Sequence, residues 1–197
     1  RGSYQPIPDI LNLCQESGNE DMVYEFASTS KMTIPGGGMA VMASSKENIY
    51  HLSRLIGVQM ISYDKVNQLR HVRFLKDKKT TLALMERHGA LLYPRFDAFL
   101  TELERLRPLE IARWTQPDGG YFIGLYTIPG CAKRTVELCQ EAGLVMTPAG
   151  AAYPYGKDPL DSHIRIAPSY PSLSDVETAA KLFCICLRLA ALEKLLK

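Results

Sequence analysis

The sequence lacks the features that mark several classes of protein. No apolar run approaches the ~18 residues of a membrane-spanning helix, and the opening residues "RGSYQPIPD" do not resemble a signal peptide. Neither sign of charge dominates, because 23 Lys and Arg stand against 21 Asp and Glu and are scattered along the chain. We therefore expect neither a membrane nor a nucleic acid as a partner, and predict a small-molecule ligand or a protein partner.

Cysteine pairing is also absent. The five cysteines form no C-x-x-C motif, and their odd number argues against a disulfide framework. We expect a soluble protein of the reducing cytoplasm. Cys184 and Cys186 point to different sides of a predicted helix, so we interpret them as buried apolar side chains and predict no metal site.

The apolar pattern is that of a globular chain. With 197 residues, 46% of them hydrophobic, the chain can bury a core in one large or two small domains. Two short apolar runs, 22–28 and 38–44, predict strands buried on both faces. The hydrophobic period then predicts helices over 45–57, 64–76 and 91–106, the last kinked at Pro94.

The second half of the chain alternates strand and helix signals. Strands are predicted over 120–127 and 163–170, with a helix over 130–142 between them. Arg165 alternates with Ile164 and Ile166, so it should face away from the core.

The last helix should bury one apolar face. A capping box from Ser174 to Glu177 predicts where it begins. The apolar positions down its buried face are Val176, Ala180, Phe183, Leu187 and Ala190. The order of elements predicts an α/β piece followed by an α+β unit, with a boundary between residues 57 and 80.

The stretch "EFASTSKMTIPGGGM" sets a lone lysine, Lys31, between hydroxyl residues and three glycines. A solvated surface charge is one interpretation. The S-x-x-K motif of penicillin-binding enzymes also requires S-D-N and K-T-G, and a phosphate loop requires glycines before the lysine; the sequence has neither arrangement. The remaining interpretation is an imine-forming amine, partly removed from water, with the hydroxyls two and three residues before it, those of Thr29 and Ser28, able to donate to a cofactor phosphate.

Several ordered motifs carry a family resemblance. "STSKMTIPGGG" resembles the S-x-S-K-x-x-x-P-G stretch of pyridoxal-phosphate aminotransferases of the aspartate aminotransferase fold type. "DGGYFIGL", "VMTPAGAAYPYG" and "HIRIAPSYPS" are similar to later motifs of that family, in the same order. "YDKVNQLRHVRFLKD" and "AALEKLL" resemble its MocR-like or aspartate aminotransferase-like group, so the resemblance runs from Glu25 to the C-terminus.

The resemblance implies roles for individual residues. Lys31 would form the Schiff base with pyridoxal phosphate and carry protons, and Ser28 and Ser30 would lie near the cofactor phosphate. Arg165 would clamp the substrate α-carboxylate, the alternative being a surface ion pair. Gly120, with its neighbour Gly119, would let the substrate lie close to the backbone, the alternative being a turn before a strand.

The resemblance also implies a fold and a domain division. The fold class is α/β, the C-terminal part of the aspartate aminotransferase fold: residues 1–60 would be a remnant of the large cofactor domain, and residues 61–197 a helical linker and the small α+β domain. The family's aspartate that pairs with the pyridine nitrogen should precede Lys31, and this sequence has no counterpart, so we expect the chain alone to be inactive. Gly37 and Gly38 follow Pro35-Gly36 where many relatives carry an arginine that binds the phosphate, so hydroxyls and amides would have to meet that charge.

The implied reaction moves an amino group between aspartate, or a similar amino acid, and the 2-oxo acid 2-oxoglutarate, in a homodimer. A second cation should then meet the distal carboxylate, unless the basic residues after Asp64 only form a solvated helix face. The candidates are Lys65, Arg70, His71 and Arg73. Two other functions stay open: a pyridoxal-phosphate-sensing domain of a MocR-type transcriptional regulator, and a non-catalytic dimerisation or interaction module.

Overall fold

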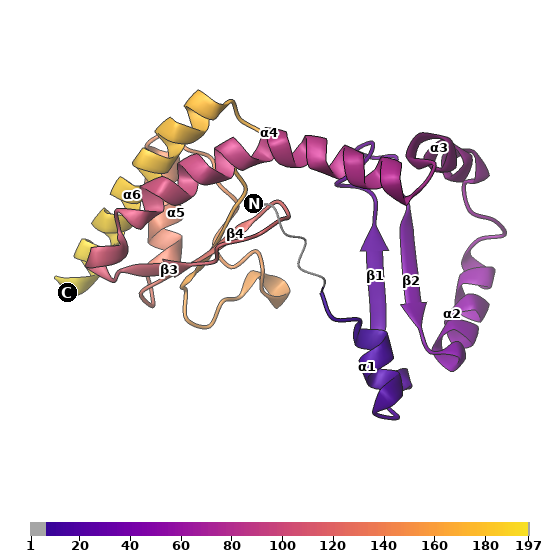
Figure 1. Ribbon diagram of the computed structural model, residues 1–197. Coiled ribbons are helices and arrows are strands. Elements are labelled where there is room, and N and C mark those ends of the chain that lie inside the picture. The colour runs from indigo at the N-terminus through magenta and orange to yellow at the C-terminus, as the bar shows by residue number, and fades with distance from the viewer. Residues whose placement is uncertain (1–6, 197) are drawn as a thin grey trace. The chain divides into compact units, whose positions relative to one another are not determined.

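The computed structural model describes residues 7–196, which divide into two compact units (Figure 1). The first unit extends to Arg87 and the second begins at His88, so the division falls inside helix α4 (Lys78–Glu104) and beyond the range predicted for the boundary. Assignment of residues 1–60 and 61–197 to a cofactor domain and a small domain stays a prediction.

The first unit contains a hairpin and three short helices before α4. Its elements are α1 (Ile10–Glu16), the 3₁₀ helix η1 (Glu20–Met22), β1 (Tyr24–Ser28), β2 (Ala40–Ser44), α2 (Lys46–Gln59) and α3 (Lys65–Leu75). The helices predicted over 45–57 and 64–76 are confirmed as α2 and α3. A capping side chain stabilises the start of each. Ser45 Oγ accepts the Asn48 N–H at 3.2 Å, and the Asp64 carboxylate accepts the Asn67 N–H at 2.8 Å.

Strands β1 and β2 lie where the sequence predicts strands, but their predicted burial is wrong. They pair antiparallel, from Tyr24 opposite Ser44 to Ser28 opposite Ala40. Phe26 is 71% exposed and Val41 is 60% exposed. Burial on both faces needs a further layer on each side of a sheet, and the described residues of this unit do not supply those layers.

The second unit is built on a three-stranded antiparallel sheet of order β3-β4-β5. After α4 its elements are η2 (Arg107–Leu109), β3 (Ala112–Trp114), β4 (Ile123–Thr127), α5 (Ala132–Glu141), η3 (Pro154–Gly156), β5 (His163–Ile166) and α6 (Leu173–Leu195). The strands predicted over 120–127 and 163–170 and the helix predicted over 130–142 are confirmed with shorter bounds. The long helix predicted over 91–106 is the second part of α4, with Pro94 inside it.

One face of this sheet carries the core. Ile123 and Leu125 of β4 and Ile164 and Ile166 of β5 are at most 3% exposed, and belong to the same buried cluster as side chains of α4 and α6. The rings of Phe99 and Phe183 lie 5.6 Å apart within it. Burying each large apolar side chain contributes about 1.5–3 kcal/mol, so this cluster holds the second unit together.

Helix α6 buries the predicted face but begins earlier than predicted. Val176, Ala180, Phe183, Leu187 and Ala190 are all buried. The cap is Ser172, whose Oγ accepts the Asp175 N–H at 3.2 Å, instead of Ser174. Ser172 and Asp175 have the same spacing as Ser174 and Glu177, so the sequence offers two competing capping pairs.

The cysteines form no disulfide: all five are free, and four of them are buried. Cys184 and Cys186 are among the buried four, as predicted. Burial raises the pKa of Cys139 and of Cys184 to about 12, so both remain neutral thiols at neutral pH.

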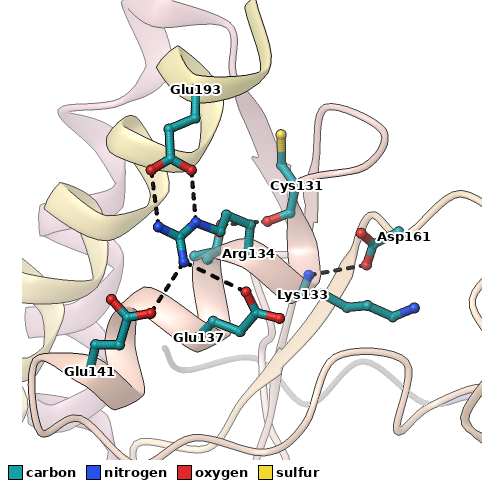
Figure 2. A network of polar contacts seen from close by, with 8 residues as sticks. Cys131, Lys133, Arg134, Glu137, Glu141, Asp161 and Glu193 are labelled. Atoms are coloured by element: carbon teal, nitrogen blue, oxygen red, sulfur yellow. Dashed lines mark hydrogen bonds and ion pairs between the residues drawn. The ribbon is translucent and has the colours of Figure 1, made fainter. Parts of the chain in front are cut away.

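Helices α5 and α6 are joined by one arginine, shown in Figure 2. Arg134 donates from Nε and from Nη2 to the two carboxylate oxygens of Glu193, at 2.7 and 3.0 Å. Its Nη1 lies 3.2 Å from a carboxylate oxygen of Glu141 and 3.6 Å from one of Glu137. The hydrogen bonds to Glu193 are the main cause that raises the pKa of Arg134. A two-donor geometry of this kind fixes the direction in which the helices meet.

Two aspartates fix the loop that leads into β5. The Asp161 Oδ1 accepts the Lys133 N–H at 3.0 Å (Figure 2), and its carbonyl oxygen accepts the Cys131 and Ala132 N–H groups at 3.1 and 3.0 Å. Asp161 therefore caps α5 from outside the helix.

The carboxylate of Asp158 accepts three backbone N–H groups in the same loop. The donors are Leu160 at 3.0 Å, and Ser162 and His163 at 2.7 Å each. Burial alone would raise the pKa of this carboxyl, but the N–H groups of His163, Ser162 and Leu160 together bring it below its ordinary value of 3.8. Because His163 is the first residue of β5, Asp158 fixes where that strand begins.

We predict that Asp158→Asn lowers the free energy of unfolding at pH 7 by about 1–3 kcal/mol, because a charged acceptor is lost. The folded pKa is lowered, so this contribution is fully present above 3.8 and disappears as the pH falls through the folded value. Urea unfolding at pH 7 and at pH 3 measures both effects. Asp118→Asn, which changes an exposed carboxylate of the same unit, is the control; equal effects of the two variants would contradict the prediction.

Candidate active site

Lys31 lies in the first unit, in a single helical turn that follows the end of β1. The Met32 and Thr33 N–H groups both donate to the Thr29 carbonyl at 2.9 Å, which closes the turn around Lys31. The lysine side chain is exposed. An imine-forming amine was expected to be partly removed from water, and the described residues of this unit do not provide that cover.

Ser28 and Ser30 lie side by side next to Lys31. Their Oγ atoms are 2.8 Å apart, and the Ser30 N–H donates to the Ser28 Oγ at 3.1 Å. Both residues are exposed. The turn therefore brings Lys31 together with the two hydroxyls that the sequence predicts; one of the two hydroxyl protons forms the bond between them, and the other can be donated elsewhere.

The structure explains why two of the three glycines are glycine, and the explanation differs between them. Gly36 has a φ of +76°, in the left-handed region that favours glycine. Gly38 packs against Ser30: a Cβ there would lie 2.4 Å from the Ser30 Oγ and 2.9 Å from its Cα. A Cβ at Gly37 would come no nearer than 3.6 Å to any atom. Gly38 therefore lets the chain fold back onto the residue before Lys31.

Helix α3 contacts the Lys31 turn through two side chains that the sequence did not assign to it. The His71 Nε2 lies 3.1 Å from the Thr29 Oγ1 and 3.0 Å from the Thr33 Oγ1. Asn67 donates from Nδ2 to the Gly37 carbonyl at 2.9 Å. His71 is only 4% exposed, so a solvated helix face is wrong for this residue. The four-residue spacing of Asn67 and His71, which puts them on one helix face, was the available signal.

Arg165 lies in the second unit, on the face of the sheet opposite the core. It pairs in register with Gly124, and its guanidinium carbon lies 4.7 Å from the centre of the Phe122 ring. Its Nε is buried, and no described residue accepts a hydrogen bond from it. No carboxylate among residues 7–196 pairs with Arg165, so the alternative of a surface ion pair is not observed. A buried donor without an acceptor is costly, which makes this guanidinium a candidate anion site.

Arg165 is among the residues that line a cavity of about 160 Å³. Met146, Thr147 and Pro171 line it as well. A larger hollow of about 440 Å³, between Tyr93 and Lys181, contains none of the predicted site residues. The chemistry therefore favours the smaller cavity.

His163 is a further polar residue on the face of Arg165 that the sequence did not single out. Its ring lies 4.9 Å from that of Tyr126 and 5.8 Å from that of Tyr153. The Arg113 guanidinium covers Tyr126 at 4.5 Å. Strand alternation would have placed His163 beside Arg165, two residues along.

Gly120 lies in the bend before β4 with a φ of +86°. This conformation explains a glycine without any ligand. Its role in substrate approach, and that of Gly119, stays a prediction.

Among residues 7–196, no group of three or more His, Cys, Asp or Glu side chains could hold a metal ion. None of the helices described is both long and apolar enough to cross a membrane.

A family model described as aspartate amino-transferase matches residues 2–197. The chain belongs to this family. A Mycolicibacterium smegmatis protein, provisionally named an aminotransferase, is 46% identical over 194 residues, which are 98% of this chain and 45% of that protein. The aspartate aminotransferase of Corynebacterium glutamicum is 39% identical over 191 residues, 96% of this chain and 44% of its own length.

The fold agrees with solved structures of the family. A crystal structure from Corynebacterium diphtheriae, also provisionally named an aminotransferase, has a TM-score of 0.91 and 40% identity, and the match covers 97% of this chain and 47% of that one. The predicted α/β aminotransferase fold is thereby confirmed. The chain spans about half the length of the relatives that it matches.

We predict that Gly38→Ala loosens the Lys31 loop, because the new methyl group would overlap the Ser30 backbone. Overpacking of this kind costs about 1–3 kcal/mol, so amide hydrogen exchange of Thr29, Ser30 and Met39 should rise at least about fivefold. Gly37→Ala is the matched control, with only ordinary contacts. Equal exchange in the two variants would show that the close approach at Gly38 does not hold the loop.

Proposed function

We propose that the protein is a pyridoxal-phosphate-dependent aminotransferase of the aspartate aminotransferase family, and that this chain is its C-terminal portion. The observation that carries the proposal is the turn in which Lys31 lies beside the hydrogen-bonded hydroxyls of Ser28 and Ser30. We expect the enzyme to act as a homodimer. The five free thiols fit a reducing cytoplasm.

The residues of the turn fit pyridoxal phosphate. Lys31 supplies a primary amine for its aldehyde, and Ser28 and Ser30 supply hydroxyl donors for its phosphate. A Cβ built at Gly36 would meet no atom within 4 Å, so there is open space beside this part of the loop. When bound, pyridoxal phosphate supplies an electron sink for the electrons of the substrate Cα.

In this proposal Lys31 has two roles. Its amine would hold the cofactor in the resting protein; once the amino group of the substrate has displaced it, the released Nζ would take the proton from the substrate Cα as a general base. One amine can do both because the turn fixes its Cα, while rotation within a four-carbon side chain can carry Nζ between the two positions. This proton transfer requires Nζ to lie within hydrogen-bonding distance of the Cα proton when the substrate is bound.

Arg165 would bind the substrate through its α-carboxylate. A guanidinium presents two parallel donors to two carboxylate oxygens, and the Phe122 ring keeps it in place from one side. Aspartate and 2-oxoglutarate both carry this carboxylate next to the reacting carbon. Lys65, Arg70 and Arg73 remain candidates for the distal carboxylate; His71 is buried and hydrogen-bonded instead.

Lys31→Ala should abolish specific capture of the cofactor, because no other amine lies in this turn. The chain is titrated with pyridoxal phosphate, followed by absorbance, reduced with borohydride and mapped by peptide mass. We expect one label on Lys31 and at least a tenfold loss of label in the variant. Lys46→Ala, which changes an exposed lysine at the start of α2, is the control.

The possible outcomes separate the candidate functions. Equal labelling of wild type and Lys31→Ala would overturn the proposal and favour a non-catalytic interaction module. Specific labelling without amino transfer by the full-length protein would favour a cofactor-sensing regulator. Amino transfer by the full-length protein but not by this chain would support both the activity and the expected inactivity of the chain alone.

Arg165→Lys in the full-length protein should raise KM for aspartate roughly 10- to 150-fold, because the second of two parallel hydrogen bonds to a charged group is lost. Steady-state kinetics with aspartate and 2-oxoglutarate measure the change. Arg113→Lys, whose guanidinium lies over Tyr126, is the matched control. A KM that is the same in both variants would remove Arg165 from the carboxylate site.

A further inference from the structure

The Lys31 turn is tied to helix α3 by a continuous series of hydrogen bonds. The Met39 N–H donates to the Thr29 Oγ1 at 2.8 Å, and that hydroxyl lies 3.1 Å from the His71 Nε2. On the other side of the ring, the His71 Nδ1 lies 3.0 Å from the Asn67 carbonyl oxygen. The series links both ends of the loop between β1 and β2 to His71 of α3.

Chemistry assigns the direction of each bond. A carbonyl oxygen can only accept, so Nδ1 carries the ring proton and Nε2 of the neutral ring is the acceptor. The Thr29 hydroxyl accepts from Met39 and so has its own proton free to donate to Nε2. The Thr33 hydroxyl can donate to the Thr29 carbonyl at 3.0 Å. Every donor therefore has an acceptor when His71 is neutral.

Burial in this unit is concentrated at the same point. Among residues 7–87, His71 is the only one that is buried. The first unit thus has no buried apolar cluster among its described residues. Its one buried side chain is His71, which contacts Thr29 and Thr33, two residues before and two residues after Lys31. Removal of this acceptor would leave the Thr29 hydroxyl with only the Met39 carbonyl, 3.4 Å away, to donate to.

We propose that His71, supported by Asn67, is a positioning residue that fixes the Lys31 turn for cofactor capture. The proposal rests on the proposed function, since it assigns Lys31 as the amine that reacts. His71 acts through Thr29 and Thr33 and itself touches neither cofactor nor substrate. Asn67 holds the far end of the same loop through the Gly37 carbonyl.

The test uses His71→Leu and His71→Gln in the whole chain. Leucine removes the acceptor, whereas the glutamine amide oxygen can reach the position of Nε2 and accept from the same hydroxyls. With pyridoxal phosphate as the probe, we expect the rate of borohydride-trapped labelling of Lys31 to fall at least tenfold in His71→Leu and to recover mostly in His71→Gln. His51→Leu, at an exposed histidine of α2, should change nothing.

A second readout does not depend on the cofactor. Amide hydrogen exchange at Thr29, Thr33 and Met39 should rise at least tenfold in His71→Leu, while exchange within α2 stays as in wild type. Labelling rates are compared per folded molecule, with the folded fraction taken from urea unfolding. Unchanged labelling and unchanged exchange in His71→Leu would overturn the proposal, as would a general rise in exchange across the unit.

Thr29→Val keeps the test decisive if His71→Leu does not fold. Valine has the shape of threonine without its hydroxyl, so it breaks the bond to His71 from the other side. The variant should slow labelling as His71→Leu does, and by a similar factor in the His71→Gln background, because glutamine keeps the acceptor that the Thr29 hydroxyl needs. Unchanged labelling in Thr29→Val would overturn the proposal.

Failure of the proposed function gives a different result. If wild type is not labelled at Lys31, the aminotransferase proposal fails, and the exchange measurements alone decide whether His71 fixes the turn. If wild type is labelled and His71→Leu is labelled at the same rate, only the role of His71 fails.

Discussion

The alternation of side chains along β4 and β5 is the constraint on which the second unit depends. Successive residues point to opposite faces, so the pleat that buries Ile164 and Ile166 must present Arg165 on the other face. Gly124 is its partner in register and carries no side chain that could cover the guanidinium. A shift of one residue in this pairing would bury the arginine in the apolar core and expose both isoleucines. The loop before β5 prevents such a shift, because two aspartates tie it to the start of the strand and to α5. The stability of the core and the orientation of the arginine thus follow from the same register.

The first unit is organised in a different way. Its hairpin is exposed and its described residues bury no apolar cluster, so the order of the Lys31 turn comes from hydrogen bonds and from one close backbone contact. Three kinds of constraint meet there: a left-handed glycine at Gly36, a missing Cβ at Gly38, and the acceptor of His71. Each acts on a different part of the loop, and none of them involves the lysine. Lys31 itself is exposed at the end of a fixed backbone, an arrangement in which precise position and chemical reactivity depend on different residues.

Much of this could be predicted from the sequence, for identifiable reasons. The helices were found because their caps and their period of 3.6 residues are local properties. Arg165 was placed correctly by alternation alone. The predicted burial of β1 and β2 was wrong because burial is not a local property: an apolar run such as "MVYEFAS" has the same composition whether or not another layer covers it. Strand β3 was not predicted because its three residues are too few to show a period. Ser172 and Ser174 compete for one helix start with equal spacing. His71 was grouped with the basic residues of the helix because the sequence does not show whether a histidine side chain accepts a hydrogen bond or carries a charge.

Asp161 illustrates how narrowly one position in this fold can vary. Its φ of +45° favours Gly, Asn and Asp over other residues. Its Oδ1 accepts the second N–H group of α5, that of Lys133, which glycine cannot do. Serine or glutamate would supply an oxygen but would be strained by the backbone conformation. Only aspartate and asparagine meet both demands, so among related chains that keep this corner the position should alternate between these two residues, even where every neighbouring surface residue has changed.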